Sequence, residues 1–454
     1  MTTRPLDARL DQGATDGLHA ALDKLSVLLL MGGTFCCSMD WQIPTPVGSL
    51  PYAHAFFLAT LMCQAPWAAQ GFARQGGISL LALAGSLLIV LSGMISVARG
   101  DAHADPGNTM RLFFALLILP LSLQLAFKDD WRRVDLVLGA WLAGATASAL
   151  VAVASRYNIA LFGFFDPESA SGGRARGLSF VTNELGYIGA LTAPVATYFV
   201  FRCGSSTGRI LALGALALVI SGIHLSGSRG STLALAAGLG AAMLGRMRPR
   251  YLPITLLLTL AVVAASVLGY TVAKELDLPI SARMEESALG RTLGLSPWTE
   301  HSDTGRRALL QFAWNGFLES PYFGQGWAYL HLAHFHLAAI LHSGGLLGTA
   351  AFLTWLTGVI LCCVRVGFAV KAGNDPVARK LWLTSVVILV VWFVNGAVQP
   401  LTWDANGYIE VGVLFALDAI YRRDRWRGQF VAHERPPPFD QPADRNGTAG
   451  RSHY

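Results

Sequence analysis

Twelve apolar runs, each near the roughly 20 residues that a helix needs to cross a bilayer, dominate this 454-residue sequence. Hydrophobic residues make up 53% of the chain and charged residues only 14%, whereas an ordinary soluble domain is about 25% charged. The sequence therefore excludes a water-soluble globular protein. It predicts an all-α polytopic integral membrane protein with about twelve transmembrane helices, at residues 22–39, 49–66, 77–97, 110–127, 134–155, 182–201, 210–225, 230–245, 252–272, 335–363, 381–398 and 404–421.

The distribution of Lys and Arg predicts the orientation of these spans. With a cytoplasmic N-terminus, 23 of the 34 basic residues fall on the cytoplasmic side, mostly in short loops, where the positive-inside rule is reliable. Both termini are then cytoplasmic. The predicted order is an N-terminal segment (1–21), nine spans (22–272), a large loop on the opposite side (273–334), three spans (335–421) and a Pro-rich, disordered cytoplasmic tail (422–454).

The large loop contains its own apolar periodicity. A stripe at helical spacing predicts an amphipathic helix on the membrane surface, with Asp303 or Thr304 as N-cap and Pro321 after its end. The stripe consists of Leu309, Leu310, Ala313, Trp314, Phe317 and Leu318.

The positions of the charges restrict the function. Proton or ion relays need ionisable residues at mid-membrane, but only Glu184, Glu410 and Asp418 are acidic residues well inside the runs. Neither a phosphate-binding glycine loop, nor a His-Glu-x-x-His pair, nor a Gly-x-Ser-x-Gly elbow is present. We therefore expect no nucleic acid partner, no cofactor, and a site on the non-cytoplasmic face.

Three groups of arginines on that face are candidate anion ligands. Arg174 and Arg176 precede the sixth run, and Asn183 stands at its start, so that two guanidinium forks and a helix N-terminus could grip a pyrophosphate. The alternative is a solvated loop with an N-cap.

Arg229 interrupts two short apolar runs in the sequence SGSRGS. An arginine left at membrane depth costs about 2.5 to 3.5 kcal/mol, so it needs an anionic partner, either a ligand or a carboxylate such as Glu184. Arg306 and Arg307 open the surface helix, where the alternative to substrate binding is contact with lipid headgroups.

Four of the eleven histidines lie within twelve residues, at positions 331, 334, 336 and 342. They have no Asp, Glu or Cys among them to complete a metal site, so we predict no metal. One of them could act as a general base, because imidazole titrates near neutral pH. A helix-start or core role is the alternative for each.

These residues resemble the motifs of the bacterial O-antigen ligase family, which shares a superfamily with O-antigen polymerases. His334 is followed by Phe335, nine residues and then Gly345-x-x-Gly348-Thr349. The family has Asn, Ser or Gln where Phe335 stands. The family's Arg-x-x-x-Leu is similar to Arg306 to Leu310, and the superfamily's Ser-Arg-Gly is similar to residues 228–230.

The resemblance implies an inverting, metal-independent glycosyltransferase with a GT-C-like fold, in the bacterial inner membrane with a periplasmic site. It would transfer polysaccharide from undecaprenyl pyrophosphate to a sugar hydroxyl of lipid A-core. His334 would be the catalytic base, and helical geometry turns His336 about 200° from it, toward lipid or packing. The residues assigned to substrate binding are Arg174, Arg176, Asn183, Arg229, Arg306, Arg307 and His336.

Two other functions stay open. A polymerase of the same superfamily would use a second lipid-linked repeat as acceptor, and the Gly-x-x-Gly-Thr match favours the ligase. A polysaccharide or lipid transporter would also be a basic multi-span protein, but the expected midplane charges and internal repeats are missing.

Overall fold

The structure is a computed structural model. It describes residues 7–39, 42–45, 48–73, 77–101, 104–127, 130–157, 159, 174–179, 181–246, 298–327, 336–373, 375–396 and 405–434. Eight of the described helices are long and apolar enough to cross a membrane, which confirms an all-α polytopic membrane protein. Each predicted run except 252–272 overlaps a helix, and that run lies outside the described residues.

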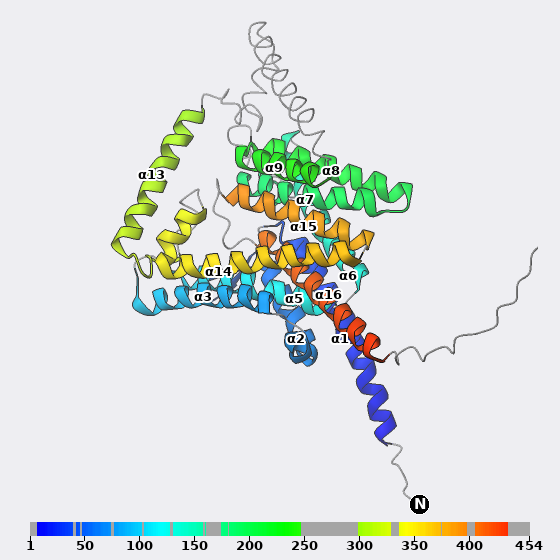
Figure 1. Cartoon of the computed structure of the whole chain (residues 1–454). Helices are drawn as coiled ribbons and strands as arrows, with labels where there is room; N and C mark the ends of the chain where they lie inside the picture. The colour runs from blue at the N-terminus through cyan, green and yellow to red at the C-terminus, as the bar shows by residue number, and fades with distance from the viewer. Residues whose placement is uncertain are drawn as a thin grey trace, which may run out of the picture.

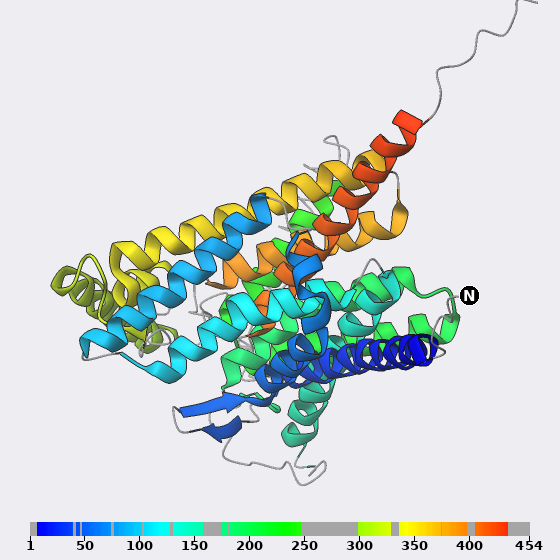
Figure 2. The same ribbon diagram turned by 90° about the horizontal axis from the view of Figure 1, so that it is seen from below.

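The described residues between 7 and 157 form six α-helices (Figure 1) and one short hairpin, whose strands are the two blue arrows in Figure 2. The strands β1 (Gln42–Thr45) and β2 (Gly48–Pro51) pair antiparallel, so the predicted second span begins with a strand and its helix starts only at Tyr52. The helices are α1 (Asp7–Cys36), α2 (Tyr52–Ala73), α3 (Gly77–Arg99), α4 (Pro106–Phe113), α5 (Leu119–Phe127) and α6 (Trp131–Arg156).

A π-helical segment, η1 (Phe114–Ile118), joins α4 to α5. Pro120, the second residue of α5, has no N–H to donate to the carbonyl of Leu116. The hydroxyl of Ser86 in α3 donates to that carbonyl instead, at 3.1 Å. The irregular turn is therefore satisfied by a neighbouring helix, as helix interiors in a membrane require.

The next described helices are α7 (Thr182–Arg202), α8 (Ser206–Ser226) and α9 (Arg229–Arg246). After the gap in the described chain come α13 (Trp298–Glu319), α14 (His336–Gly373), α15 (Pro376–Gly396), the 3-10 turn η5 (Ala405–Tyr408) and α16 (Ile409–Glu434). α16 extends past the predicted end of the last span at residue 421, so the first part of the predicted tail is helical. The rest of that tail lies outside the described residues.

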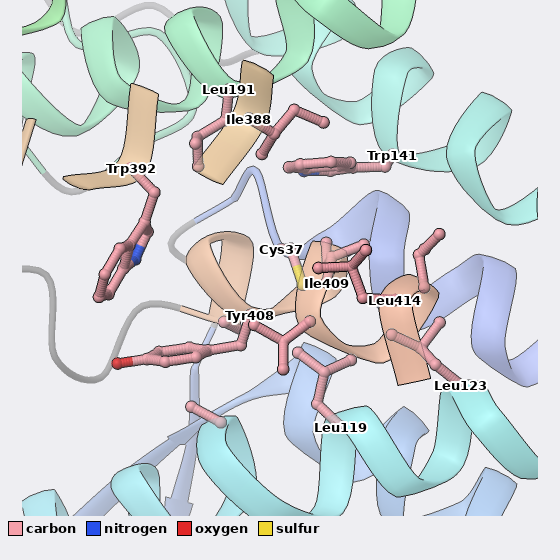
Figure 3. Packing of buried hydrophobic residues seen from close by; sticks show 14 of the residues in the cluster. Cys37, Leu119, Leu123, Trp141, Leu191, Ile388, Trp392, Tyr408, Ile409 and Leu414 are labelled. Carbon is pink, nitrogen blue, oxygen red and sulfur yellow. The ribbon is translucent and has the colours of Figure 1, made fainter. Parts of the chain in front are cut away.

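Buried aromatic rings from α14 and α15 pack around η5. The rings of Trp355, Trp392 and Tyr408 are mutually packed, with centroids 5.6 to 6.2 Å apart. Figure 3 shows apolar side chains around Trp392 and Tyr408. Asn406 accepts a hydrogen bond from Trp141 Nε1 at 2.8 Å and donates to the carbonyl of Cys37 at 2.7 Å. This amide therefore ties η5 to α6 and to the end of α1.

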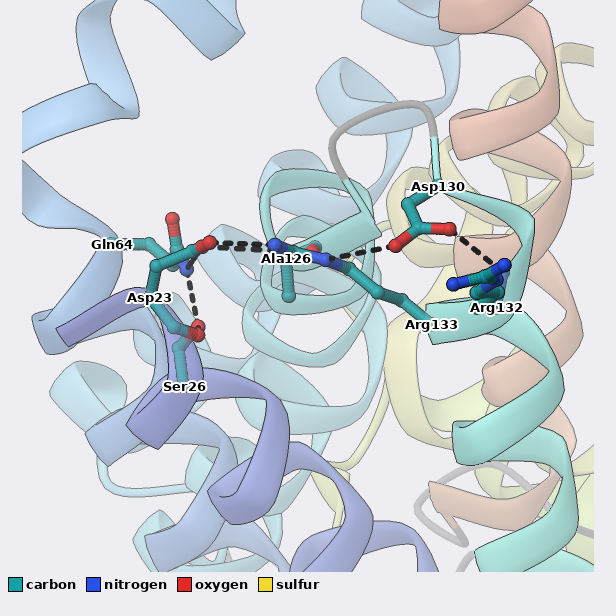
Figure 4. A network of polar contacts seen from close by, with 7 residues as sticks. All are labelled: Asp23, Ser26, Gln64, Ala126, Asp130, Arg132 and Arg133. Atoms are coloured by element: carbon teal, nitrogen blue, oxygen red, sulfur yellow. Dashed lines mark hydrogen bonds and ion pairs between the residues drawn. The ribbon is translucent and has the colours of Figure 1, made fainter. Parts of the chain in front are cut away.

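Several arginines predicted to be cytoplasmic make ion pairs within the chain. Arg133 reaches Asp23 with both nitrogens of its fork, at 3.0 and 2.6 Å (Figure 4). The other pairs are Arg202 with Asp135, and Arg365 and Arg422 with Asp418. Pairing lowers the cost of placing these charges between helices.

Figures 1 and 2 both place α13 at one end of the helical body, and the start of α1 and the end of α16 at the opposite end. The surface helix and the two described ends of the chain are therefore separated by the length of the spanning helices.

Candidate functional site

Arg174 joins three segments of the predicted site. Its Nε donates to the carbonyl of Ser226 at 2.6 Å, where α8 ends. Its terminal nitrogen donates to Oδ1 of Asn183 in the first turn of α7. Two residues that were predicted together as ligands of one pyrophosphate are thus in direct contact.

The backbone after Arg174 is fixed by α6 and α8. Ala175 N donates to the carbonyl of Leu225 at 2.9 Å, and Leu178 N donates to Ser148 Oγ at 3.0 Å. Gly177 has φ of +61°, and a Cβ there would lie 2.4 Å from the carbonyl oxygen of Ser148. Only glycine fits this turn, which positions the backbone of Arg176 beside the end of α8.

The Ser-Arg-Gly motif forms the break between α8 and α9. Gly227 ends α8 in the left-handed conformation, with φ of +61°. Ser228 caps α9, with its Oγ 2.9 Å from Ser231 Oγ and 3.4 Å from Ser231 N. The half-buried Arg229 therefore stands at the first position of α9, beside the segment that Arg174 contacts.

Asn395 was not singled out from the sequence, although it is a polar residue near the end of an apolar run. It is fully buried at the end of α15, and its Oδ1 accepts from Ser231 Oγ at 3.5 Å. The next residue, Gly396, lies against His336: a Cβ added to Gly396 would be 3.6 Å from the Cβ of His336. The end of α15 thus connects the Arg229 break with the first turn of α14.

His336 is the first residue of α14 and is buried among aromatic rings. Its ring centroid lies 5.1 Å from that of Phe352 and 5.4 Å from that of Trp392. Of the two orientations expected for it, lipid or packing, the structure has packing. Substrate contact by His336 stays a prediction, and His331 and His334 lie outside the described residues.

The fourth histidine lies where α13 crosses α14. His342 is buried, its ring is 5.1 Å from that of Phe312, and a Cβ on Gly316 would lie 2.3 Å from the imidazole. Gly316 therefore makes room for the His342 ring, which has a core role at this crossing.

The Gly-x-x-Gly-Thr motif is a break in α14 that receives the loop after α13. Gly345 has φ of +57° and ψ of −153°, and Thr349 Oγ1 donates to its carbonyl at 2.7 Å. Four backbone hydrogen bonds join the two segments. The N–H groups of Gln325 and Gly326 donate to the carbonyls of His342 and Ser343 at 2.8 and 3.0 Å, and those of Leu346 and Leu347 donate to the carbonyls of Pro321 and Tyr322 at 2.8 and 3.1 Å.

The motif also makes room for a buried indole. Trp327 lies against Gly344 and Gly348, where a Cβ would be 2.8 and 3.3 Å from its Cζ2. Asn108 Nδ2 donates to the Trp327 carbonyl at 3.3 Å. Trp327 therefore anchors the end of the loop, at the beginning of the segment that contains His334.

The surface helix differs from its prediction at one end. α13 begins at Trp298, so Asp303 and Thr304 lie inside the helix and are not its N-cap. The end before Pro321 is as predicted. Arg306 and Arg307 lie on α13, where the Arg307 side chain is exposed and that of Arg306 is outside the described part.

Arg307 lines a cavity of about 430 Å³ between α13 and the first turns of α14. The other lining residues are Leu310, Gln311, Ala313, Trp314, Ala338 and Leu341. The predicted site is thus divided: Arg174, Asn183 and Arg229 gather where α7, α8 and α9 meet, while Arg307 faces a separate cavity on α13.

No group of three potential metal ligands occurs in the described ranges, and metal independence stays a prediction to be tested.

Comparison with known proteins gives a family match over part of the chain. None of the curated proteins matches the chain. Residues 214–337 match the family model of O-antigen ligase. The match runs from α8 to the start of α14 and includes Arg229, Arg306, Arg307 and His334, whereas Arg174 and the Gly-x-x-Gly-Thr motif lie outside it. The resemblance predicted from the motifs is confirmed over residues 214–337, which match the O-antigen ligase model.

Proposed function

We propose that the protein is an O-antigen ligase of the bacterial inner membrane. It transfers polysaccharide from undecaprenyl pyrophosphate to a sugar hydroxyl of lipid A-core on the periplasmic face. The observation that carries the proposal is the junction of α7, α8 and α9. There Arg174 contacts Asn183 and the end of α8, Arg229 begins α9, and the end of α15 leads to the start of α14.

The junction suits a pyrophosphate leaving group. Arg174, Arg176 and Arg229 supply guanidinium groups. The helices α7 and α9 both begin at the junction, and the positive ends of their dipoles also favour a bound anion. As the bond between the anomeric carbon and the phosphate oxygen breaks, negative charge grows on that oxygen. Fixed positive groups stabilise it without a metal ion.

His334 is the proposed general base. It precedes the first residue of α14 by two positions, between the Trp327 anchor and the buried His336. A neutral imidazole takes the proton of the acceptor hydroxyl while that oxygen bonds to the anomeric carbon from the face opposite the leaving group. The configuration at the anomeric carbon is then inverted.

A lipopolysaccharide gel of a deletion strain tests the function. Loss of a ligase leaves lipid A-core without O-antigen, while lipid-linked polymer accumulates. Loss of a polymerase leaves lipid A-core carrying one repeat unit, and that pattern would contradict the proposal. A strain complemented with the wild-type gene is the control.

A further inference from the structure

The cavity between α13 and α14 combines three kinds of binding group. Arg307, Leu310, Gln311 and Trp314 follow the spacing i, i+3, i+4 and i+7 and so share one face of α13. The Trp314 side chain is 51% exposed, which leaves its ring open to a ligand. A volume of about 430 Å³ is within the usual range for sites that bind small molecules.

These groups suit an acidic sugar. The indole of Trp314 offers a flat apolar surface on which the C–H face of a pyranose can stack. Gln311 Nε2 donates to Asn315 Oδ1 at 3.0 Å, which orients the amide and leaves Oε1 to accept from a sugar hydroxyl. Arg307 supplies a fork that matches phosphate or carboxylate.

The location favours a glycan over a lipid chain. α13 is not among the described helices that are long and apolar enough to cross a membrane, and it lies at the end of the body opposite the chain ends (Figures 1 and 2). The cavity is therefore at the end of the spanning helices, where the sugars of a glycolipid extend beyond its acyl chains.

The cavity and the arginine junction lie on opposite faces of the start of α14. His336 faces α15 through Trp392 and Gly396. Ala338 and Leu341 line the cavity, and helical geometry turns them about 140 to 200° from His336. A donor at the junction and an acceptor in the cavity would therefore approach the start of α14 from two sides.

We infer that this cavity binds the acceptor glycan, through a phosphorylated or otherwise acidic sugar, with Trp314 stacking on a ring and Arg307 contacting the anionic group. The assignment of the glycan as acceptor rests on the proposed function. The binding of an acidic oligosaccharide to the cavity is independent of that function.

Binding of a soluble probe tests the inference directly. The probe is the core oligosaccharide released from the host lipopolysaccharide, used with its phosphates and after their removal, and titrated calorimetrically into the full chain in nanodiscs of neutral lipid. We expect Trp314→Ala and Arg307→Gln each to weaken binding of the phosphorylated probe by about 10-fold. Removing the phosphates should weaken wild-type binding by the same factor as Arg307→Gln, and the two changes together should cost no more than either alone.

Leu318→Ala is the matched control, because Leu318 is exposed on the same helix but does not line the cavity. It should bind the probe as the wild type does. Undiminished binding to Trp314→Ala and Arg307→Gln would overturn the inference, as would absence of wild-type binding. Displacement of the probe by phosphatidylglycerol in the nanodisc would identify a lipid headgroup site and would also overturn it.

Steady-state kinetics separate this inference from the proposed function. If both hold, Trp314→Ala raises the KM for the acceptor about 10-fold and leaves the KM for the donor unchanged. Probe binding at the cavity together with a polymerase gel pattern would support the binding site and contradict the ligase assignment. A ligase gel pattern with no probe binding would support the ligase assignment and contradict the binding site.

Discussion

Individual arginines of the site have different surroundings, and these predict different outcomes on removal. Arg174 holds the end of α8 to the start of α7, so its loss should lower stability together with activity. Arg176→Ala and Arg229→Ala should each lower the rate of transfer by about 10- to 150-fold, since a charge-assisted contact to pyrophosphate contributes about 1.5 to 3 kcal/mol. Lysine at either position should restore part of the rate of transfer, because it keeps the positive charge but lacks the planar guanidinium fork.

Initial rates at equal amounts of folded protein measure these effects. Arg132→Ala is the control, because Arg132 is exposed at the start of α6 and is not among the residues assigned to the site. A wild-type rate in Arg176→Ala or Arg229→Ala would remove that residue from the site.

The two neighbouring histidines should differ in activity. General-base catalysis contributes about 10²- to 10⁴-fold, so His334→Ala should abolish detectable transfer in cells at normal protein level. His336→Ala should keep most activity if its role is packing against Phe352 and Trp392.

The pH dependence of the wild-type rate separates a base from an acid. A base must be neutral, so the rate should rise between about pH 6 and 7, where imidazole titrates. A rate that falls over this interval would show an imidazolium that binds the donor phosphate. An active His334→Ala beside an inactive His336→Ala would contradict the assignment.

At the scale of elements, the break in α14 gives the Gly-x-x-Gly-Thr motif a structural reason. A Cβ on Gly345 would lie 2.6 to 2.7 Å from backbone atoms of residues 321–324, and the conformation of Gly345, with positive φ and ψ of −153°, is essentially restricted to glycine and costs a residue with a side chain about 1 to 3 kcal/mol. Gly345→Ala should therefore lower the thermal midpoint of the detergent-solubilised protein and detach the loop from α14.

Gly214→Ala is the matched change, because Gly214 lies within α8 with nothing within 4 Å of a Cβ. It should leave the midpoint unchanged or raise it slightly. Equal midpoints for Gly345→Ala and the wild type would contradict the docking of the loop on this break.

The positions of the helices could be predicted from the sequence, but several of their contacts could not. Runs of apolar residues mark spans because a bilayer has a fixed thickness. Periodicity within residues 298–319 also predicted a surface helix. Its start was placed too late, because Asp is a common N-cap residue and Asp303 was taken as one, although it lies inside the helix. Asn395 was missed, because its contact with Ser231 joins residues 164 positions apart.

At the scale of the whole molecule, the orientation in the membrane is the main prediction. The structure separates α13 from both described chain ends (Figures 1 and 2), and the charge distribution assigns the chain ends to the cytoplasm. A fluorescent protein fused after Tyr454 should therefore fluoresce, and alkaline phosphatase inserted near Ser296 should be active. Inactive phosphatase at Ser296, with the fusion protein present in the membrane, would place α13 in the cytoplasm and contradict a periplasmic site.

The most direct test of the central claim is transfer by the purified protein from undecaprenyl pyrophosphate-linked polysaccharide to lipid A-core, measured in the presence of EDTA. The account predicts lipid A-core carrying the polysaccharide, formed at the same rate with or without the chelator. Extension of the lipid-linked donor with no transfer to lipid A-core would contradict the assignment as a ligase. A rate that collapses in EDTA and returns with magnesium or manganese would contradict catalysis by the arginine junction without a metal ion.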